Sequence, residues 1–163
     1  MGFISLYAVP KKGVLKLVTT YKNSSGGAHL VWEYLFQKYI KCADKTQIQD
    51  NYDDVFQLSE NKKINSYEKV CLELTFDKAI LKLEHIPSAC LVLDTMFLAI
   101  NGADMPVVNH LKSISEDLKK IYLEKKVYGV CFNWTSITEG WKSDKEERLW
   151  DIFKDSGHWF LFE

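Results

Sequence analysis

The sequence predicts an α+β fold in a single domain, with a mixed or antiparallel sheet of about four to five strands packed with about four helices. Residues 127–134 are uncharged and rich in β-branched and aromatic side chains, which is typical of a central strand buried on both faces. Segments with helical character flank this stretch and have to pack on it. A length of 163 residues suits one hydrophobic core, so 1–163 is expected to be one globular domain.

The first part of the chain contains a predicted strand and a long predicted helix. Residues 3–9 form the strand, and residues 14–18 fit either a second strand or a short helix. The helix is expected over residues 28–41, with Ser24 or Ser25 as its cap. Its apolar residues cover more than one stripe, so it is either deeply embedded or offers a second apolar side to a partner.

The middle of the chain alternates between polar and apolar segments. Residues 42–66 are polar, acidic and weakly periodic, which predicts one long loop with a turn of helix around 53–58. Residues 70–76 alternate with a period of two, which predicts a half-buried strand. Residues 78–85 fit a paired strand or a helical turn. A helix is expected over 87–100, with proline at its start and Asn-Gly at its end.

Two further helices are predicted in the second half. The first begins at Pro106, and its apolar stripe consists of Val107, Leu111, Ile114, Leu118 and Ile121. The second begins at a capping box formed by Ser143 and Glu146 and ends near Gly157. Residues 158–162 are a candidate for the last strand.

The charge distribution is more informative than the net charge. A net charge of −1 argues against a dedicated nucleic-acid binder, which usually has a strong basic excess. Residues 1–41 are basic, whereas 43–60 and 139–163 are acidic. These acidic segments are either parts of a mixed, solvated surface or one patch for a basic partner.

The cysteines and the hydropathy pattern predict a cytoplasmic protein. Cys42, Cys71, Cys90 and Cys131 form no CxxC pair, and we expect four free, buried thiols. The first ten residues do not resemble a signal peptide, and the apolar stretches are shorter than a membrane span. We therefore expect no membrane contact.

Catalytic and metal-binding patterns are sparse. The histidines stand apart, without HxxxH or HExxH spacing, so we expect no metal and no cofactor. Cys131 with His85 or His158 is a candidate nucleophile and base, but burial in an uncharged strand favours inert packing. Residues 24–27 offer backbone N–H groups to an anion but lack phosphate-loop spacing, which favours a flexible start of the helix. We assign no catalytic residue.

The first functional hypothesis is a non-enzymatic cytosolic binding or inhibitor protein. It rests on the missing catalytic patterns, on an aromatic content of 13% and on the acidic segments. Its concrete form is a bacterial immunity protein that neutralises a toxic nuclease, with a basic toxin domain as the protein partner and no direct nucleic-acid contact. The predicted partner-binding residues are Asp50, Tyr52, Asp53, Asp54 and Glu60.

The alternative hypothesis is a small-molecule-binding protein or enzyme with a pocket at the end of the central strand. Strand ends are common positions for ligand sites. The predicted pocket residues are Asn133, Trp134, Thr135, Glu139 and Trp141, with the tryptophans as walls and the glutamate as the acid. A third possibility is a homodimer that buries the aromatic faces of the 28–41 helix.

Overall fold

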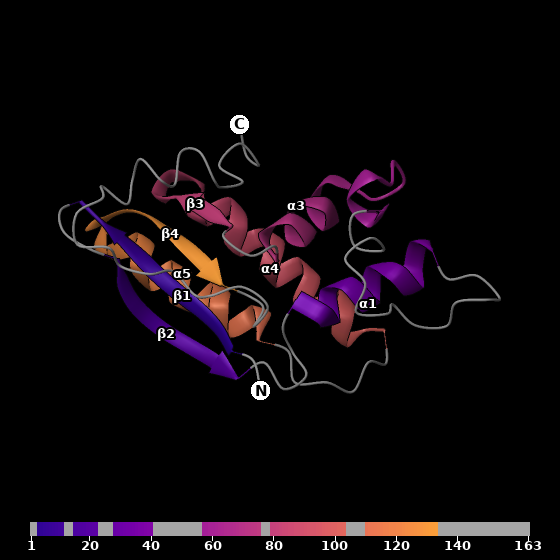
Figure 1. Cartoon of the computed structure of the whole chain (residues 1–163), viewed down its shortest axis with the longest axis horizontal. Coiled ribbons are helices and arrows are strands. Elements are labelled where there is room, and N and C mark those ends of the chain that lie inside the picture. Colours follow the sequence, from indigo (N-terminus) through magenta and orange to yellow (C-terminus); the bar gives the residue numbers. More distant parts are fainter. Residues whose placement is uncertain are drawn as a thin grey trace.

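The computed structural model describes residues 3–11, 15–22, 28–40, 57–75, 79–103 and 110–133, and it confirms the predicted α+β fold (Figure 1). The strands are β1 (Phe3–Pro10), β2 (Lys16–Lys22), β3 (Ile80–Lys82) and β4 (Val127–Asn133). The helices are α1 (Ala28–Tyr39), α3 (Ser66–Leu74), the 3-10 turn η1 (Leu83–His85), α4 (Ile86–Asn101) and α5 (Leu111–Glu124). The helix predicted after Ser143 and the strand predicted at 158–162 lie outside the described residues.

The sheet is antiparallel throughout, and β4 lies in its interior. The strand order is β2-β1-β4-β3, so β4 pairs with β1 on one side and with β3 on the other. Phe132 pairs with Leu6 and belongs to the main core, while Cys131 pairs with Ile80 on the opposite face. Phe132 and Cys131 are both buried, so the predicted central strand, buried on both faces, is confirmed.

Strand β2, one of the two structures that the sequence allowed at 14–18, lies at an edge of the described sheet. Its register against β1 shifts between Leu6 and Tyr7, which places Val18 in a β-bulge. The strand begins and ends with the exposed Lys16 and Lys22. Bulges and lysines both discourage pairing of an edge strand with another chain, so this edge is protected against aggregation.

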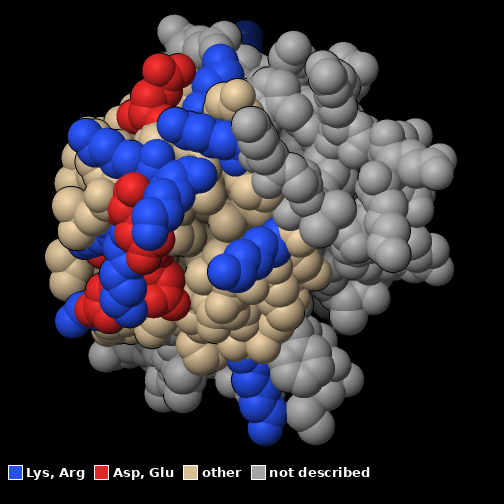
Figure 2. Space-filling model, turned by 90° about the vertical axis from the view of Figure 1, so that its left-hand side faces the viewer, with Lys and Arg blue, Asp and Glu red and all other residues tan. Residues whose placement is uncertain are grey.

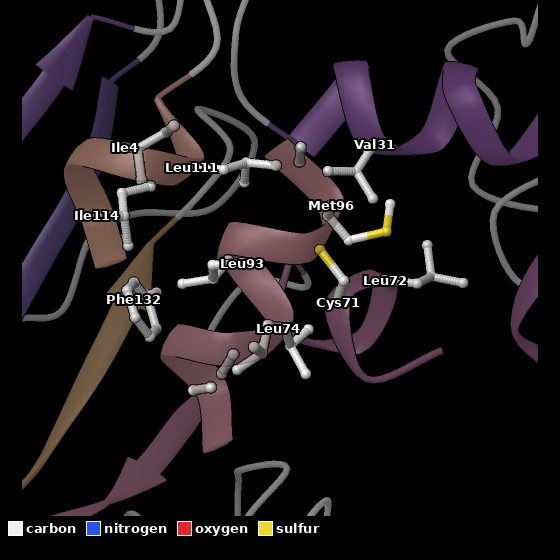
Figure 3. Packing of buried hydrophobic residues seen from close by; sticks show 14 of the residues in the cluster. Ile4, Val31, Cys71, Leu72, Leu74, Leu93, Met96, Leu111, Ile114 and Phe132 are labelled. Atoms are coloured by element: carbon white, nitrogen blue, oxygen red, sulfur yellow. The ribbon is translucent and has the colours of Figure 1, made fainter. Parts of the chain in front are cut away.

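Helix α4 occupies the centre of the fold. It packs against α5 on one side and against α1 and α3 on the other. Leu93 points toward Phe132 of the sheet, whereas Met96 lies near Val31 of α1 and Cys71 of α3 (Figure 3). The helix therefore joins the sheet layer to the α1–α3 layer through one continuous hydrophobic core.

The two predicted helices around α4 and α5 are confirmed where the structure describes them. Pro87 lies in the first turn of α4, and Gly102 follows its last residue with a right-handed backbone. In α5 the predicted stripe is buried at Leu111, Ile114 and Leu118. The predicted start at Pro106 lies outside the described residues.

The strand predicted at residues 70–76 is wrong, because residues 70–74 belong to helix α3. The apolar residues in the segment alternate, but the buried positions are Glu68, Cys71, Leu72 and Leu74, which recur with helical spacing. Cys71, which lies within this segment, is completely buried in the core.

Local hydrogen bonding explains why α3 begins where it does. The side chain of Asn65 accepts a hydrogen bond of 2.8 Å from the backbone N–H of Glu68, which is an N-cap contact. Asn65 followed three residues later by Glu68 resembles a capping box, and this signal favours a helix over a strand. Residues 78–85, where both structures were allowed, contain β3 and then the turn η1.

Helix α1 is deeply embedded, which was one of the two possibilities for residues 28–41. Trp32 and Phe36 are buried together with the aliphatic residues of the helix. The indole Nε1 of Trp32 donates a hydrogen bond of 2.8 Å to Oγ1 of Thr75, a buried residue at the end of α3. The aromatic side chains of α1 thus pack largely within the chain.

Within the described residues, one helical stretch, Leu83–Asn101, is long and apolar enough to cross a membrane by length and composition alone. This stretch is η1 with α4. The core helix of a protein can be equally long and apolar. Helix α4 packs against other helices on two sides, and this position explains why it is rich in apolar residues.

The contact between β3 and β4 requires glycine at position 129. A Cβ atom on Gly129 would lie 2.3 Å from the carbonyl oxygen of Leu81, so the backbone would have to shift. We expect Gly129→Ala to lower the free energy of unfolding by about 1–3 kcal/mol through overpacking. Gly102→Ala is the control, because its Cβ would lie 3.4 Å from the nearest atom. Equal effects of the two substitutions in urea unfolding would contradict this role of Gly129.

Candidate functional site

The buried cysteines are poorly suited to nucleophilic catalysis. Cys71, Cys90 and Cys131 are free and buried, as predicted for them, and Cys42 lies outside the described residues. Burial raises the pKa of Cys131 far above its ordinary value. Burial and the nearby carboxylate of Glu68 raise the pKa of Cys71 to about 12. These two thiols remain protonated at neutral pH, which favours the core-packing interpretation of Cys131.

The structure describes few of the residues predicted to form sites. Glu60 is exposed at the end of a short helical segment, 57–60, in which Leu58 is buried in the core. Asn133 ends β4. The remaining predicted partner-binding and pocket residues lie outside the described part of the chain: Asp50, Tyr52, Asp53, Asp54, Trp134, Thr135, Glu139 and Trp141.

An open groove of about 290 Å³ lies between α3 and α4. It is lined by Ser66, Tyr67 and Val70 of α3 and by Ser88, Leu91 and Val92 of α4. Tyr67 is 47% exposed and Leu91 is 54% exposed, whereas Val92 is buried. The groove therefore combines an apolar floor, two accessible apolar side chains and two serine hydroxyls.

Helical spacing positions these side chains. Ser66 and Val70 are four residues apart on α3, and Ser88 and Val92 are four residues apart on α4, so each helix turns one row of residues toward the groove. The volume lies just below the range of about 300–1,000 Å³ for small-molecule pockets. It is suited to one or two apolar side chains of a partner. The sequence analysis missed this groove because it predicted a strand at 70–76. The helix cap at Asn65 is the sequence signal that could have indicated α3, which forms one wall of the groove.

A second, larger cavity of about 490 Å³ lies beside α1. The described residues in its lining are Glu33, Tyr34, Gln37, Lys38 and Ala103. The polar groups on its wall are hydrogen-bonded within the protein: Gln37 Nε2 donates to Glu33 Oε1 at 2.5 Å, and Lys38 Nζ donates to Glu68 Oε1 at 2.5 Å. Its size suits a small molecule, but these groups are engaged in holding the fold.

The carboxylate of Glu68 is the most deeply buried charged group among the described residues. It accepts hydrogen bonds from the ammonium of Lys38 and from the hydroxyl of Tyr39, and this ammonium also lies 5.1 Å from the centre of the Tyr39 ring. The hydrogen bond to Glu68 raises the pKa of Lys38 although burial lowers it. The cluster compensates a buried charge and ties α1 to α3.

Another polar cluster joins β2 to α5. The hydroxyl of Tyr21 donates to Asp117 Oδ2 at 2.5 Å, and Lys120 Nζ donates to Asp117 Oδ1 at 2.7 Å. Burial and the hydrogen bond to Asp117 raise the pKa of Tyr21, so the phenol stays protonated. The His110 ring lies 5.7 Å from the Tyr21 ring, and its Nε2 lies 2.9 Å from the carbonyl oxygen of Lys22. The members bond to one another and anchor an edge strand.

No group of three or more His, Cys, Asp or Glu side chains that could hold a metal ion occurs within the described ranges. No protein-family model, curated protein or solved structure matches the chain.

The contact between Tyr21 and Asp117 should make stability depend on pH. Burial alone would raise the pKa of Asp117, but hydrogen bonds from Lys120 and Tyr21 lower it below the ordinary value of an aspartate. A lowered pKa in the folded state means that this contribution is present above the unfolded value and is lost as the pH falls through the folded value. We expect Tyr21→Phe to cost about 1–2 kcal/mol at neutral pH and less below about pH 4.

Urea unfolding of the wild type and Tyr21→Phe at neutral and acidic pH measures this difference. Tyr67→Phe is the matched control, because its phenol is on the surface. A cost of Tyr21→Phe that stays constant across the acidic range would contradict a charge-assisted hydrogen bond.

Substitutions at the Glu68 cluster should differ in cost according to which group remains buried. Lys38→Met leaves the carboxylate without its cationic partner and is expected to cost about 2–3 kcal/mol. Glu68→Gln leaves Lys38, whose side chain is 42% exposed, in contact with water and is expected to cost about 1 kcal/mol. The exposed pair Lys119–Asp94 provides the control, Lys119→Met, which should have little effect. The reverse order in urea unfolding would contradict this account.

Proposed function

We propose that this chain is a non-catalytic binding protein that holds a protein partner against the α3–α4 groove. The supporting observation is the pair Tyr67 and Leu91, which are half exposed on facing helices above the buried Val92. An accessible aromatic side chain beside an apolar recess is typical of the few residues that dominate a protein interface. The tightly engaged polar clusters and the protonated thiols favour binding over catalysis.

The acidic stretch indicates that the proposed partner is basic. Leu58 is buried in the core and holds the segment 57–60 against the body, with Glu60 exposed six residues before Ser66 of the groove. Asp50, Asp53 and Asp54 precede this segment in the chain. A basic partner would be steered by these carboxylates and held by an apolar anchor in the groove. In the most specific form of the proposal, the partner is a basic toxin nuclease and the chain is its cytoplasmic inhibitor.

Substitution of the groove should remove the partner without unfolding the protein. A tagged chain is used to capture its partner from the source cells, and the purified partner is then titrated against variants. We expect Tyr67→Ala with Leu91→Ser to weaken binding by about 1,000-fold, since two interface anchors that contribute about 2 kcal/mol each add up to about 4 kcal/mol. Leu123→Ser is the control, because Leu123 is a 77% exposed leucine on α5. Equal affinities of the groove variant and the Leu123→Ser variant would refute the proposal that the partner binds at the groove.

Neutralising the acidic stretch should lower the rate at which the protein associates with its partner. We expect the combined variant Asp50→Asn, Asp53→Asn, Asp54→Asn and Glu60→Gln to associate more slowly and to lose most of its dependence on salt. Unchanged association kinetics at low salt would exclude the basic partner while leaving the groove proposal standing.

A further inference from the structure

We propose that the end of the sheet that carries exposed lysines binds the surface of an anionic lipid bilayer. This lysine end consists of residues 10–11 at the end of β1, residues 16–18 at the start of β2, and residues 123–128, which run from the last turn of α5 into β4. The sheet register brings these segments together, because Pro10 pairs with Val127 and Ala8 pairs with Lys16. Figure 2 faces this side of the molecule and shows basic side chains gathered on it, with acidic ones among them.

Positive charge is the first property of the lysine end. Lys11, Lys16, Lys125 and Lys126 are all exposed there. Glu124 lies 4.0 Å from Lys126 and offsets one of these charges, so the four lysines and one glutamate leave this end with a net charge of about +3. Lys125 has a left-handed backbone with φ of 52°, which makes the connection from α5 to β4 tight and keeps its two lysines at the tip.

Exposed apolar side chains are the second property. Leu123 is 77% exposed in the last turn of α5, and Tyr128 is 45% exposed at the start of β4. Leu17 and Val18 are 51% and 41% exposed at the start of β2, where the bulge turns consecutive residues outward. Most of the large, exposed apolar side chains among the described residues thus lie beside the lysines. Such a combination suits a lipid interface, where lysines contact headgroups and apolar tips enter the acyl boundary.

The chemistry favours lipid over nucleic acid. Both ligands attract lysine, but proteins that hold single-stranded nucleic acid add a row of aromatic side chains on which successive bases stack. Leu17, Val18 and Leu123 are aliphatic, and they gain nothing from phosphates in water, whereas transfer into a bilayer removes apolar surface from water. The sequence-based expectation of no membrane contact rested on the absence of a spanning segment, and peripheral binding needs no such segment.

The test uses the full-length chain and vesicles of phosphatidylcholine with or without phosphatidylserine in a flotation assay. We expect flotation only with phosphatidylserine and weaker flotation at high salt. The variant Lys11→Gln, Lys16→Gln, Lys125→Gln and Lys126→Gln should bind at least about tenfold more weakly. Leu123→Ser should weaken binding about threefold or more at unchanged charge. Retained circular dichroism spectra establish that these surface variants are folded.

Matched controls lie elsewhere on the surface. Lys62→Gln with Lys63→Gln removes exposed lysines before α3, and Leu91→Ser removes an exposed leucine from the groove. Both should float like the wild type, which separates this inference from the proposed groove. No flotation with phosphatidylserine, or equal flotation without it, would overturn the inference. Lysine-dependent binding of duplex DNA or RNA without flotation would assign this end to nucleic acid and would also overturn it.

Discussion

The position of α4 between two layers is the constraint on which the rest of the structure depends. Its contacts with α5 and the sheet on one side, and with α1 and α3 on the other, make one core from elements that are distant in sequence. Helix α4 can approach α5 closely because Cys90 and Ser115 are small. The thiol of Cys90 lies 3.5 Å from the carbonyl oxygen of Ser115, and the hydroxyl of Ser115 lies 3.4 Å from the carbonyl oxygen of Cys90. A helix buried on two sides has only a narrow outer surface, and Leu91 and Leu98 remain exposed on it.

Two clusters of ionisable side chains stabilise the fold by joining separate elements. Glu68, Lys38 and Tyr39 compensate one another between α1 and α3, and Tyr21 and Asp117 hold β2 to α5. The hydrogen bonds of both clusters join separate elements, so these charged and phenolic groups have a structural role. The accessible features are instead an apolar groove and charged regions, which are the elements of recognition.

The sequence predicted the elements that have one clear period and missed those that depend on distant partners. The uncharged run of β4 and the apolar stripe of α5 can be interpreted in isolation. Residues 70–76 satisfied two periods at once, and the helix is favoured by the Asn65 cap and by packing on α4. The α3–α4 groove required both helices in place. The lysine end required the sheet register, which sequence periodicity cannot supply.

The net charge of −1 conceals a separation of charge that bears on both proposals. Lysines gather at the sheet end, whereas the acidic stretch at 43–60 connects α1 to the segment before α3. In Figure 1 the tip of β1 lies at the left, while α1 and α3 lie toward the right. A bilayer at the lysine end would therefore leave these helices facing the aqueous side. The exposed carboxylate of Glu60, which lies before α3, would also be repelled by anionic lipid, so charge would orient the protein with α1 and α3 toward a partner in solution.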